Sequence, residues 1–367
     1  MVIAVLAAVV IASAAVFASL SPDENRGSPD PYIPDIPDLE PDYPEGVSFD
    51  PETGTLSYVG EVTWSVTDDL VAYLDKKTET VTSETVVLGK GLYSVSIGGD
   101  PFYVVVPGKE TIHLSWDYKF NGETHTVEVT YDVDIAELSK ITVYNRKWND
   151  GVNNNLFTNL PRQVYVNDTV KNIVSQLKDA YVRIGGSVDD RQSYADFIAS
   201  FAQLGIGYPP WEIVPETGIE SSDYHYWGVN EYWANTLETL YFGKGDCEDS
   251  SAVACSLFIA AGFKTAMVGG HGHVMSSVSL DGFEKRDTPT YGVIMLSFDE
   301  ATSASAHCVS DPNVTYYGVD TTKGQTPVGY LLKEQLKYIN ADSDEKASMP
   351  QGMSGYYSVD GYGSVPY

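Results

Sequence analysis

The clearest pattern along the chain is a strict alternation of apolar and polar residues between positions 112 and 133. The apolar residues of the first run are Ile112, Leu114, Trp116, Tyr118 and Phe120, and those of the second are Val127, Val129, Tyr131 and Val133. Alternation with a period of two is typical of a β-strand that buries one face. Asn121-Gly122 stands between the runs and favours a tight turn. The segment is therefore predicted to form an antiparallel hairpin.

Shorter apolar runs come before this hairpin, at 61–66, 92–97 and 102–106, and Gly and Pro turns separate them. Several short strands at such spacing are typical of a sandwich of two antiparallel sheets. We therefore expect residues 46–134 to form an all-β, immunoglobulin-like domain. We find no catalytic constellation within this domain, so a spacer is the preferred interpretation and a binding role is the alternative.

From about Ile135 the apolar residues recur at helical spacing. We expect an α+β domain over residues 135–340. A first predicted helix follows a capping residue at Asn167 or Asp168. Its recurring apolar residues are Val170, Ile173, Val174, Leu177 and Tyr181. Those of a second predicted helix, which ends at Gly205, are Tyr194, Phe197, Ile198 and Phe201. Strand-like segments occur later, at 265–268, 273–280, 291–298 and 315–320.

Both ends of the chain differ in composition from the middle. Residues 2–20 form an apolar run without charge, close to the length that spans a bilayer and similar to the hydrophobic part of a signal peptide. We therefore expect residues 1–20 to be a signal peptide or a membrane anchor, and the protein to be secreted or held at the cell surface. Residues 21–45 are predicted to be an extended, solvated linker rich in Pro and Asp. The residues at 341–367, rich in Gly, Ser and Tyr, are predicted to be a disordered tail.

The charge of the chain argues against a nucleic-acid-binding protein, and its cysteine content argues against a disulfide-rich scaffold. The 367 residues include 51 Asp and Glu against 22 Lys and Arg, which gives a formal net charge of −29. Such a surface repels phosphate backbones, so nucleic acid is not expected as a partner. The three cysteines are too few for a disulfide scaffold. Cys255 and Cys308 either form one bridge or act as small buried hydrophobic residues.

A third predicted helix begins at Cys247, and its start carries the first chemical signal. Gly243 and Gly245 precede the cysteine and allow a close approach of the chain. A helix N-terminus carries partial positive charge and free N–H groups, which favour a thiolate and can stabilise an oxyanion. Glu248 and Asp249 oppose thiolate formation, so the sequence leaves open the net effect on the thiol.

Two later strands supply the partners that a catalytic thiol needs. His273 opens one predicted strand and Asp320 ends another. A thiol that attacks an amide needs an imidazole to accept its proton, and the imidazole needs a carboxylate that fixes its tautomer. We therefore predict a triad of Cys247 as nucleophile, His273 as base and Asp320 as orienting acid. His271 lies on the same side of its strand as His273 and is the alternative base.

Together these segments resemble three motifs of the transglutaminase-like superfamily, in particular its exported archaeal and bacterial members. The segments are Gly243-Lys244-Gly245-Asp246-Cys247-Glu248-Asp249, Gly272-His273-Val274 and Val319-Asp320-Thr321-Thr322. The resemblance covers about 194–322 and implies a papain-like core, in which the cysteine helix packs on an antiparallel sheet that bears the histidine and the aspartate. The segment 281–313 is longer than a compact core of this family needs. The family includes protein cross-linkers, cysteine peptidases, peptide amidases and members that have lost catalysis.

A papain-like site also needs a side chain that donates a hydrogen bond to the oxyanion. Gln203 is the candidate and Trp233 is the second choice, and the alternative for Gln203 is a solvated residue at a helix end. His307 beside Cys308 suggests a pair of metal ligands, but no further His or Cys spacing supports a zinc site. We therefore expect neither a metal nor a cofactor.

The triad and the resemblance favour an exported thiol enzyme that acts on peptide or isopeptide amide bonds. Its partner would be a protein or peptide substrate at the cell surface, and a membrane if residues 1–20 stay attached. Hydrolysis of an acyl-enzyme is the preferred interpretation. A cross-linking acyl transferase, which passes the same intermediate to an amine, is the first alternative. The second is a non-catalytic surface binding module, which would have no need of a complete triad.

Overall fold

The described part of the chain leaves out the termini and several internal segments. The computed structural model describes residues 36–39, 42–151, 160, 162–270, 273–284, 291–293, 295–297, 315–322, 324–332, 353–358 and 364–366. The expected signal peptide or anchor at 1–20 therefore lies outside the described residues. Among the helices that are described, none combines the length and the apolar character needed to cross a membrane.

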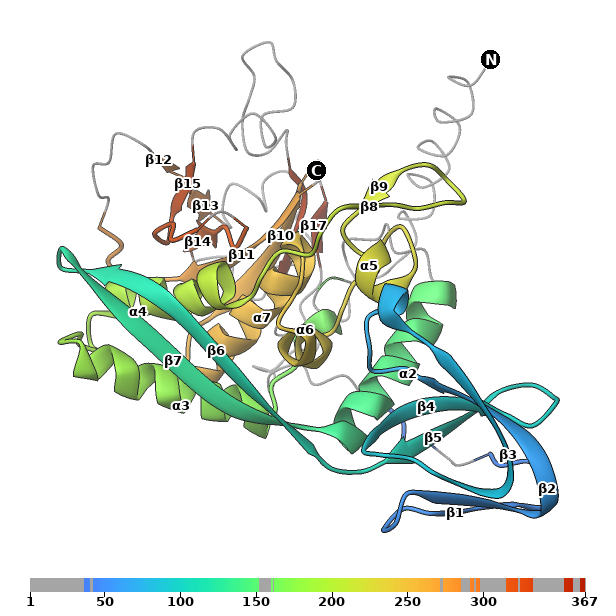
Figure 1. Cartoon of the computed structure of the whole chain (residues 1–367). Helices are drawn as coiled ribbons and strands as arrows, with labels where there is room; N and C mark the ends of the chain where they lie inside the picture. The colour runs from blue at the N-terminus through green and yellow to red at the C-terminus, as the bar shows by residue number, and fades with distance from the viewer. Residues whose placement is uncertain are drawn as a thin grey trace, which may run out of the picture. The chain divides into compact units, whose positions relative to one another are not determined.

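The first strands of the chain form one antiparallel sheet of five strands (Figure 1). These strands are β1 (Val47–Asp50), β2 (Thr55–Asp68), β3 (Thr78–Val87), β4 (Gly91–Ser96) and β5 (Phe102–Val106). Their order is β1-β2-β4-β5, and β3 pairs with β2. Leu56, Trp64 and Val104 are wholly buried and belong to a core that this sheet builds from its own residues. The polar residues that alternate with these buried ones lie on the other face of the strands, which is exposed to solvent, as the period-two pattern predicts.

The predicted hairpin is confirmed, with the predicted turn. It consists of β6 (Lys109–Phe120) and β7 (Glu123–Asp134), and its register runs from the pair of Lys109 with Asp134 to the pair of Phe120 with Glu123. Asn121 and Gly122 connect the strands and both have positive φ, at 52° and 83°. Positive φ at both central positions is the requirement of the type I′ turn that Asn-Gly favours.

The hairpin is a separate two-stranded sheet, and it shares its core mainly with helices and also with Leu92 of β4. Its buried residues share one core with helices of the second half of the chain. Trp116 Nε1 donates a hydrogen bond to Ser200 Oγ at 3.1 Å, and the Tyr131 hydroxyl donates to the carbonyl of Leu240 at 2.8 Å. The structure therefore groups the strands differently from the expected immunoglobulin-like domain at 46–134. Alternation shows that one face of a strand is buried, but it does not show which element covers that face.

The end of the predicted linker also packs on the fold. Ile36 is buried in the same core as the hairpin. Lys140 Nζ lies 2.8 Å from Asp38 Oδ1, and Lys140 belongs to α2 (Ile135–Gly151). These residues are therefore not part of a solvated spacer, because isoleucine at position 36 interrupts the polar composition and has an apolar surface to cover.

The first predicted helix begins at the predicted capping residue. Asn167 caps α3 (Asp168–Arg183) by accepting a hydrogen bond from the backbone N–H of Val170 at 3.1 Å. The next helix, α4 (Arg191–Ser200), continues through a π-helical turn (Phe201–Gly205) that ends at the predicted glycine. Further along the chain, α6 (Thr236–Phe242) ends before Gly243, and α7 (Cys247–Ala260) begins two residues after Gly245.

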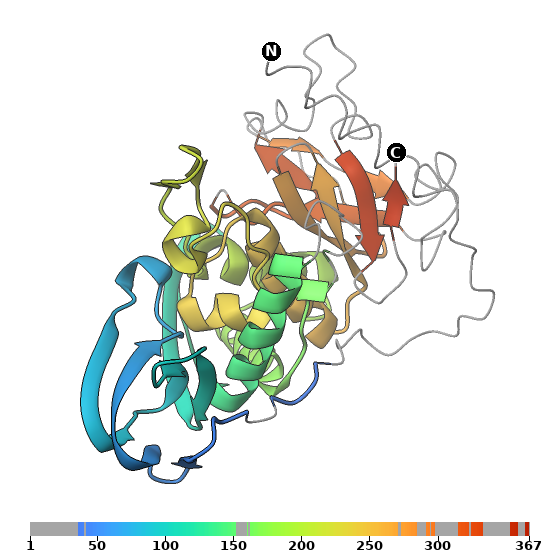
Figure 2. The same cartoon turned by 90° about the vertical axis from the view of Figure 1, so that its right-hand side faces the viewer.

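A second sheet carries the later strands and receives α7 on one face (Figure 2). Its strands are β10 (Thr265–Gly270), β11 (His273–Ser279), β12 (Tyr291–Val293), β13 (Met295–Ser297), β14 (Thr315–Val319), β15 (Tyr330–Leu332), β16 (Met353–Ser358) and β17 (Ser364–Pro366). The order is β12-β15-β14-β11-β10-β16-β17, and β13 pairs with β14. All described pairs are antiparallel except β14 with β15. Helices and a largely antiparallel sheet confirm the α+β class.

Two strands of this sheet come from the segment predicted to be a disordered tail. β16 pairs with β10 and β17 pairs with β16. The prediction of disorder at 341–367 is therefore wrong for these described residues. The many Gly and Ser residues suggested a segment too polar to pack. Tyr356 and Tyr357 are nevertheless good strand formers, and the free edge of β10 supplies backbone partners for them.

Candidate active site

Two glycines set the position of Cys247 at the start of α7. Gly243 ends α6 with φ at 61°, a conformation that glycine adopts without strain. Gly245 packs so closely that an added Cβ would lie 2.6 Å from Asp249 Cβ and 2.7 Å from Thr239 Cγ2. The chain then turns at Asp246 and enters the helix with Cys247 as its first residue. The predicted helix start at Cys247 is thereby confirmed.

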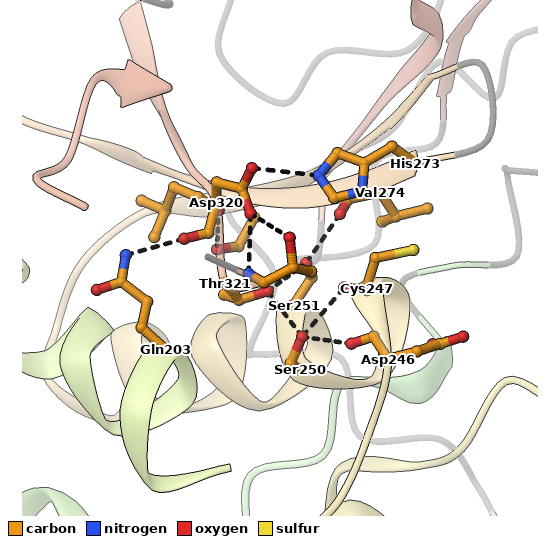
Figure 3. Close-up of polar contacts among 12 residues, drawn as sticks. Gln203, Asp246, Cys247, Ser250, Ser251, His273, Val274, Asp320 and Thr321 are labelled. Carbon is orange, nitrogen blue, oxygen red and sulfur yellow. Dashed lines mark hydrogen bonds and ion pairs between the residues drawn. The ribbon is translucent and has the colours of Figure 1, made fainter. Parts of the chain in front are cut away.

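The second sheet brings His273 and Asp320 together, although 46 residues separate them in the sequence. Strand β11, which begins at His273, pairs with β14 through Ser276 and Val319, and Asp320 follows directly after β14. His273 Nε2 lies 3.3 Å from Asp320 Oδ2. Figure 3 shows the Cys247 side chain pointing from the N-terminus of α7 toward this imidazole. The three predicted residues therefore meet at one place, where α7 faces the sheet.

Asp320 is buried but held as a carboxylate. Its Oδ1 accepts hydrogen bonds from the Thr322 backbone N–H at 2.8 Å and from Thr322 Oγ1 at 2.9 Å. Burial alone raises the pKa of Asp320, but the hydrogen bonds and the charge of His273, together with Thr322, outweigh burial and lower the pKa below its ordinary value. An ionised Asp320 is the form that can orient the imidazole.

The surroundings of His273 favour its protonated form. Burial alone lowers the pKa of His273, but interactions with Asp320 and with the Cys247 sulfur outweigh burial and raise the pKa to about 10. An imidazole with this pKa accepts the proton of a nearby thiol readily. A protonatable imidazole next to a thiol is the arrangement that catalysis by a cysteine requires.

The two acidic residues that follow Cys247 are both buried. Glu248 Oε2 lies 3.1 Å from Cys247 Sγ. Burial and the charge of Asp246 raise the pKa of both Glu248 and Asp249 well above its ordinary value. Because the neutral form of each carboxyl is favoured, their repulsion of a thiolate is smaller than two full charges would give.

A hydroxyl cluster beneath the site ties α7 to the sheet, and the sequence did not reveal it. Ser250 Oγ lies 2.7 Å from Thr321 Oγ1, and Ser251 Oγ lies 3.4 Å from the same atom. Ser250 also donates to the carbonyl of Asp246 (Figure 3). These contacts fix the start of the helix against the residue that follows Asp320. The only signal in the sequence was the run of hydroxyl residues next to Cys247 and Asp320, which is too common to be informative.

Gln203 has a different place from the one expected. Its Nε2 donates hydrogen bonds to the carbonyls of Asp320 and Thr326, both at 2.8 Å, so both amide hydrogens are used. Figure 3 shows its side chain directed at Asp320 rather than at Cys247. Gln203 therefore fixes the loop that carries Asp320 and has no hydrogen left for an oxyanion. The π-helical turn at Phe201–Gly205 sets this direction, and periodicity cannot predict such a turn.

The second oxyanion candidate lies closer to the thiol. Trp233 is buried and belongs to the same hydrophobic cluster as Cys247. Its Nε1 donates to Glu231 Oε1 at 2.9 Å, however. The remaining donors are the backbone N–H groups at the start of α7, where Asp246 makes no side-chain cap. The first N–H groups of a helix have no partner within it, so they are the better candidates for binding an oxyanion.

Of the other candidate residues, Cys255 is described by the structure, whereas His271, His307 and Cys308 are not. Cys255 is a free thiol on the buried face of α7 and is wholly buried, which agrees with a small hydrophobic residue. The alternative base His271, and the pair of His307 with Cys308, lie outside the described residues. Cys308 would be the partner of Cys255 in the alternative of a disulfide bridge, and it also lies outside the described residues.

Comparison with known proteins gives no relative from which to transfer a function. No protein-family model, no curated protein and no solved structure matches the chain. The site itself brings together a thiol at a helix N-terminus, an imidazole and a buried carboxylate, an arrangement that suits covalent catalysis at a carbonyl.

Proposed function

We propose that this protein is an exported thiol enzyme with a papain-like, transglutaminase-like core that acts on peptide or isopeptide amide bonds. The observation that carries the proposal is the 3.3 Å contact of His273 with Asp320 beside a cysteine at a helix start. Three separate elements contribute these groups, and a purely structural role does not require that they meet. The packing of α7 on the antiparallel sheet supports the same proposal.

In the proposed reaction, the Cys247 thiolate attacks the carbonyl carbon of the amide and forms a C–S bond. The N–H groups at the start of α7 stabilise the negative oxygen. The imidazolium of His273 gives its proton to the leaving nitrogen as the C–N bond breaks, which leaves a thioester and a free amine. Water then attacks the thioester with His273 as base, and the products are a carboxylic acid and the regenerated thiol.

Cross-linking is the second candidate function because it differs only in the last step. An amine in place of water would yield a new amide from the same thioester. The incomplete burial of Cys247 allows either acceptor to approach. We favour hydrolysis, because the described site has no element that excludes water from the thiol.

Selective labelling of the thiol tests the proposed nucleophile. Limiting iodoacetamide is expected to modify Cys247 before the other cysteines, because Cys247 is partly accessible and faces His273. Cys255 is the internal control, since it is wholly buried and burial raises its pKa to about 12. Mass spectrometry of the adducts gives the order of labelling. Equal or faster labelling of Cys255 or Cys308 would remove the basis of the proposal.

Amine incorporation separates hydrolysis from cross-linking. The protein is incubated with a peptide library, with and without a labelled primary amine. We expect new peptide termini or deamidated glutamine, and little amine in the products, because water has free access to the thioester. Incorporation of the amine at glutamine as the main product would favour the acyl transferase. If neither product forms and Cys247 is unreactive, the surface binding module is the remaining interpretation.

A further inference from the structure

A short hairpin stands close to the start of α7, and the proposed reaction does not use it. Its strands are β8 (Glu212–Ile213) and β9 (Glu220–Ser221), and we call residues 208–221 the projecting hairpin. Figure 1 and Figure 2 both show it standing out from the fold. The backbone N–H of Val214 donates to the carbonyl of Ile219 at 2.9 Å and closes the turn. A defined backbone therefore presents the side chains of this segment.

Backbone hydrogen bonds hold the base of the projecting hairpin against the approach to Cys247. The N–H of Gly207 donates to the carbonyl of Gly243 at 2.9 Å, and the N–H of Gly245 donates to the carbonyl of Gly207 at 3.1 Å. Tyr208 follows directly in the chain. Burial raises the pKa of Tyr208, and nearby charges that include that of the Cys247 sulfur raise it further. A substrate carbonyl held at Cys247 therefore lies close to the first residue of the hairpin.

Large apolar side chains of the projecting hairpin face solvent. Trp211 is 59% exposed, Ile213 is 62% exposed and Ile219 is 57% exposed. The rings of Tyr208 and Trp211 stack with their centroids 6.3 Å apart. The two residues between these rings are both proline, which restricts the backbone that carries them. Aromatic and aliphatic side chains exposed together on a rigid support are typical of a surface that a partner covers.

The charge around the projecting hairpin selects the kind of partner. Residues 208–231 contain no Lys or Arg, and Glu216, Glu220 and Glu231 are exposed. Lys244 lies at the base of the hairpin, where its side chain packs against the backbone of the preceding segment. An anionic membrane surface, or a second copy of a chain whose net charge is −29, would be repelled by these carboxylates. A partner that carries basic residues would be attracted.

We propose that the projecting hairpin docks the substrate by binding an extended peptide segment that carries aromatic or aliphatic side chains next to lysine or arginine. This inference rests on the proposed function, because it describes how a protein substrate is held while one of its amides reaches Cys247. Apolar side chains of the substrate cover Trp211 and Ile213, and its basic side chains pair with Glu216 and Glu220. Ile213 and Glu220 are directly opposite each other across the two strands, so one face of the hairpin offers both kinds of contact.

Peptide binding to the full-length Cys247→Ala chain tests docking separately from catalysis, because this variant cannot form an acyl-enzyme. The probe is a short fluorescein-labelled peptide in which phenylalanine and lysine alternate, flanked by glycine and serine. Two comparison peptides have serine in place of phenylalanine, or glutamate in place of lysine. Fluorescence anisotropy is expected to show that the probe binds about tenfold more tightly than either comparison peptide. No binding of the probe, or equal binding of all three peptides, would overturn the proposal.

This measurement also separates a failure of docking from a failure of the proposed reaction. If the thiol of the unmodified protein does not react with iodoacetamide and the probe still binds to Cys247→Ala, the reaction is refuted and the docking surface stands. If the thiol reacts and the probe does not bind, the docking surface is refuted and the reaction stands.

Further substitutions in the Cys247→Ala chain show whether the probe binds at this place. Trp211→Ala is expected to weaken binding by about tenfold or more, and Ile213→Ala by less. Glu220→Lys is expected to shift the preference toward the glutamate peptide. Val87→Ala is the matched control, because Val87 is an apolar residue of β3 that is 69% exposed, and it should leave the affinity unchanged. Unchanged affinity in a folded Trp211→Ala variant would place the peptide elsewhere and overturn the proposal.

Discussion

Replacing His273 with alanine is expected to reduce turnover of an amide substrate by about 10²–10⁴-fold, the usual contribution of a general base. The reason is that the imidazole, which Asp320 orients, is the group placed to take the thiol proton and return it to the leaving nitrogen. The rate at which iodoacetamide labels Cys247 should fall as well, because the thiolate loses its imidazolium partner. This second readout does not require knowledge of the natural substrate.

Two further variants test whether the loss of turnover and labelling is specific to His273→Ala. His113→Ala is the matched control, because His113 is exposed on the hairpin and contacts Thr130 at 2.8 Å. It should leave both turnover and labelling unchanged. Asp320→Ala should lose less turnover than His273→Ala, because Asp320 orients the base without touching substrate. Circular dichroism checks that each variant is folded. Wild-type labelling and turnover in a folded His273→Ala variant would refute the assignment of the base.

Replacing Phe197 with alanine is expected to lower the free energy of unfolding by about 3–5 kcal/mol, which is typical of a buried phenylalanine. Phe197 is wholly buried on α4, and its ring centroid lies 4.9 Å from that of Tyr118 on β6 and 4.9 Å from that of Tyr181 on α3. The ring therefore connects the hairpin to two helices. Equilibrium unfolding in urea or guanidinium measures the change.

The exposed Val182 on α3 provides the comparison for Phe197. Its side chain is 53% exposed, so Val182→Ala should change the free energy of unfolding by less than about 0.5 kcal/mol. A loss of less than about 1 kcal/mol for Phe197→Ala would mean that the hairpin does not share a core with the helices.

Local features of this fold were predictable where a residue acts through its neighbours in sequence. Asn121-Gly122 specifies its turn through the φ values that both residues tolerate. Asn167 caps its helix through a hydrogen bond to a residue only three positions away. The start of α7 at Cys247 follows in the same way from the glycines before it.

Features that depend on distant partners were not predictable in this way. The alternating residues of β6 and β7 show a buried face, but only the tertiary structure reveals that helices cover it. Gln203 was correctly located near the site, yet its contacts with the carbonyls of Asp320 and Thr326 depend on a π-helical turn.

The pairing of β16 with β10 has a consequence for the order in which the chain can complete its structure during synthesis. β10 and β11 leave the ribosome long before residues 353–358 exist, and until then one edge of β10 has no backbone partner. An open strand edge readily pairs with other chains. The hairpin and its helices can assemble early, but β10 gains its second strand partner only when residues 353–358 arrive. Premature termination before these residues would therefore produce chains that contain Cys247, His273 and Asp320 and still associate through the exposed edge of β10.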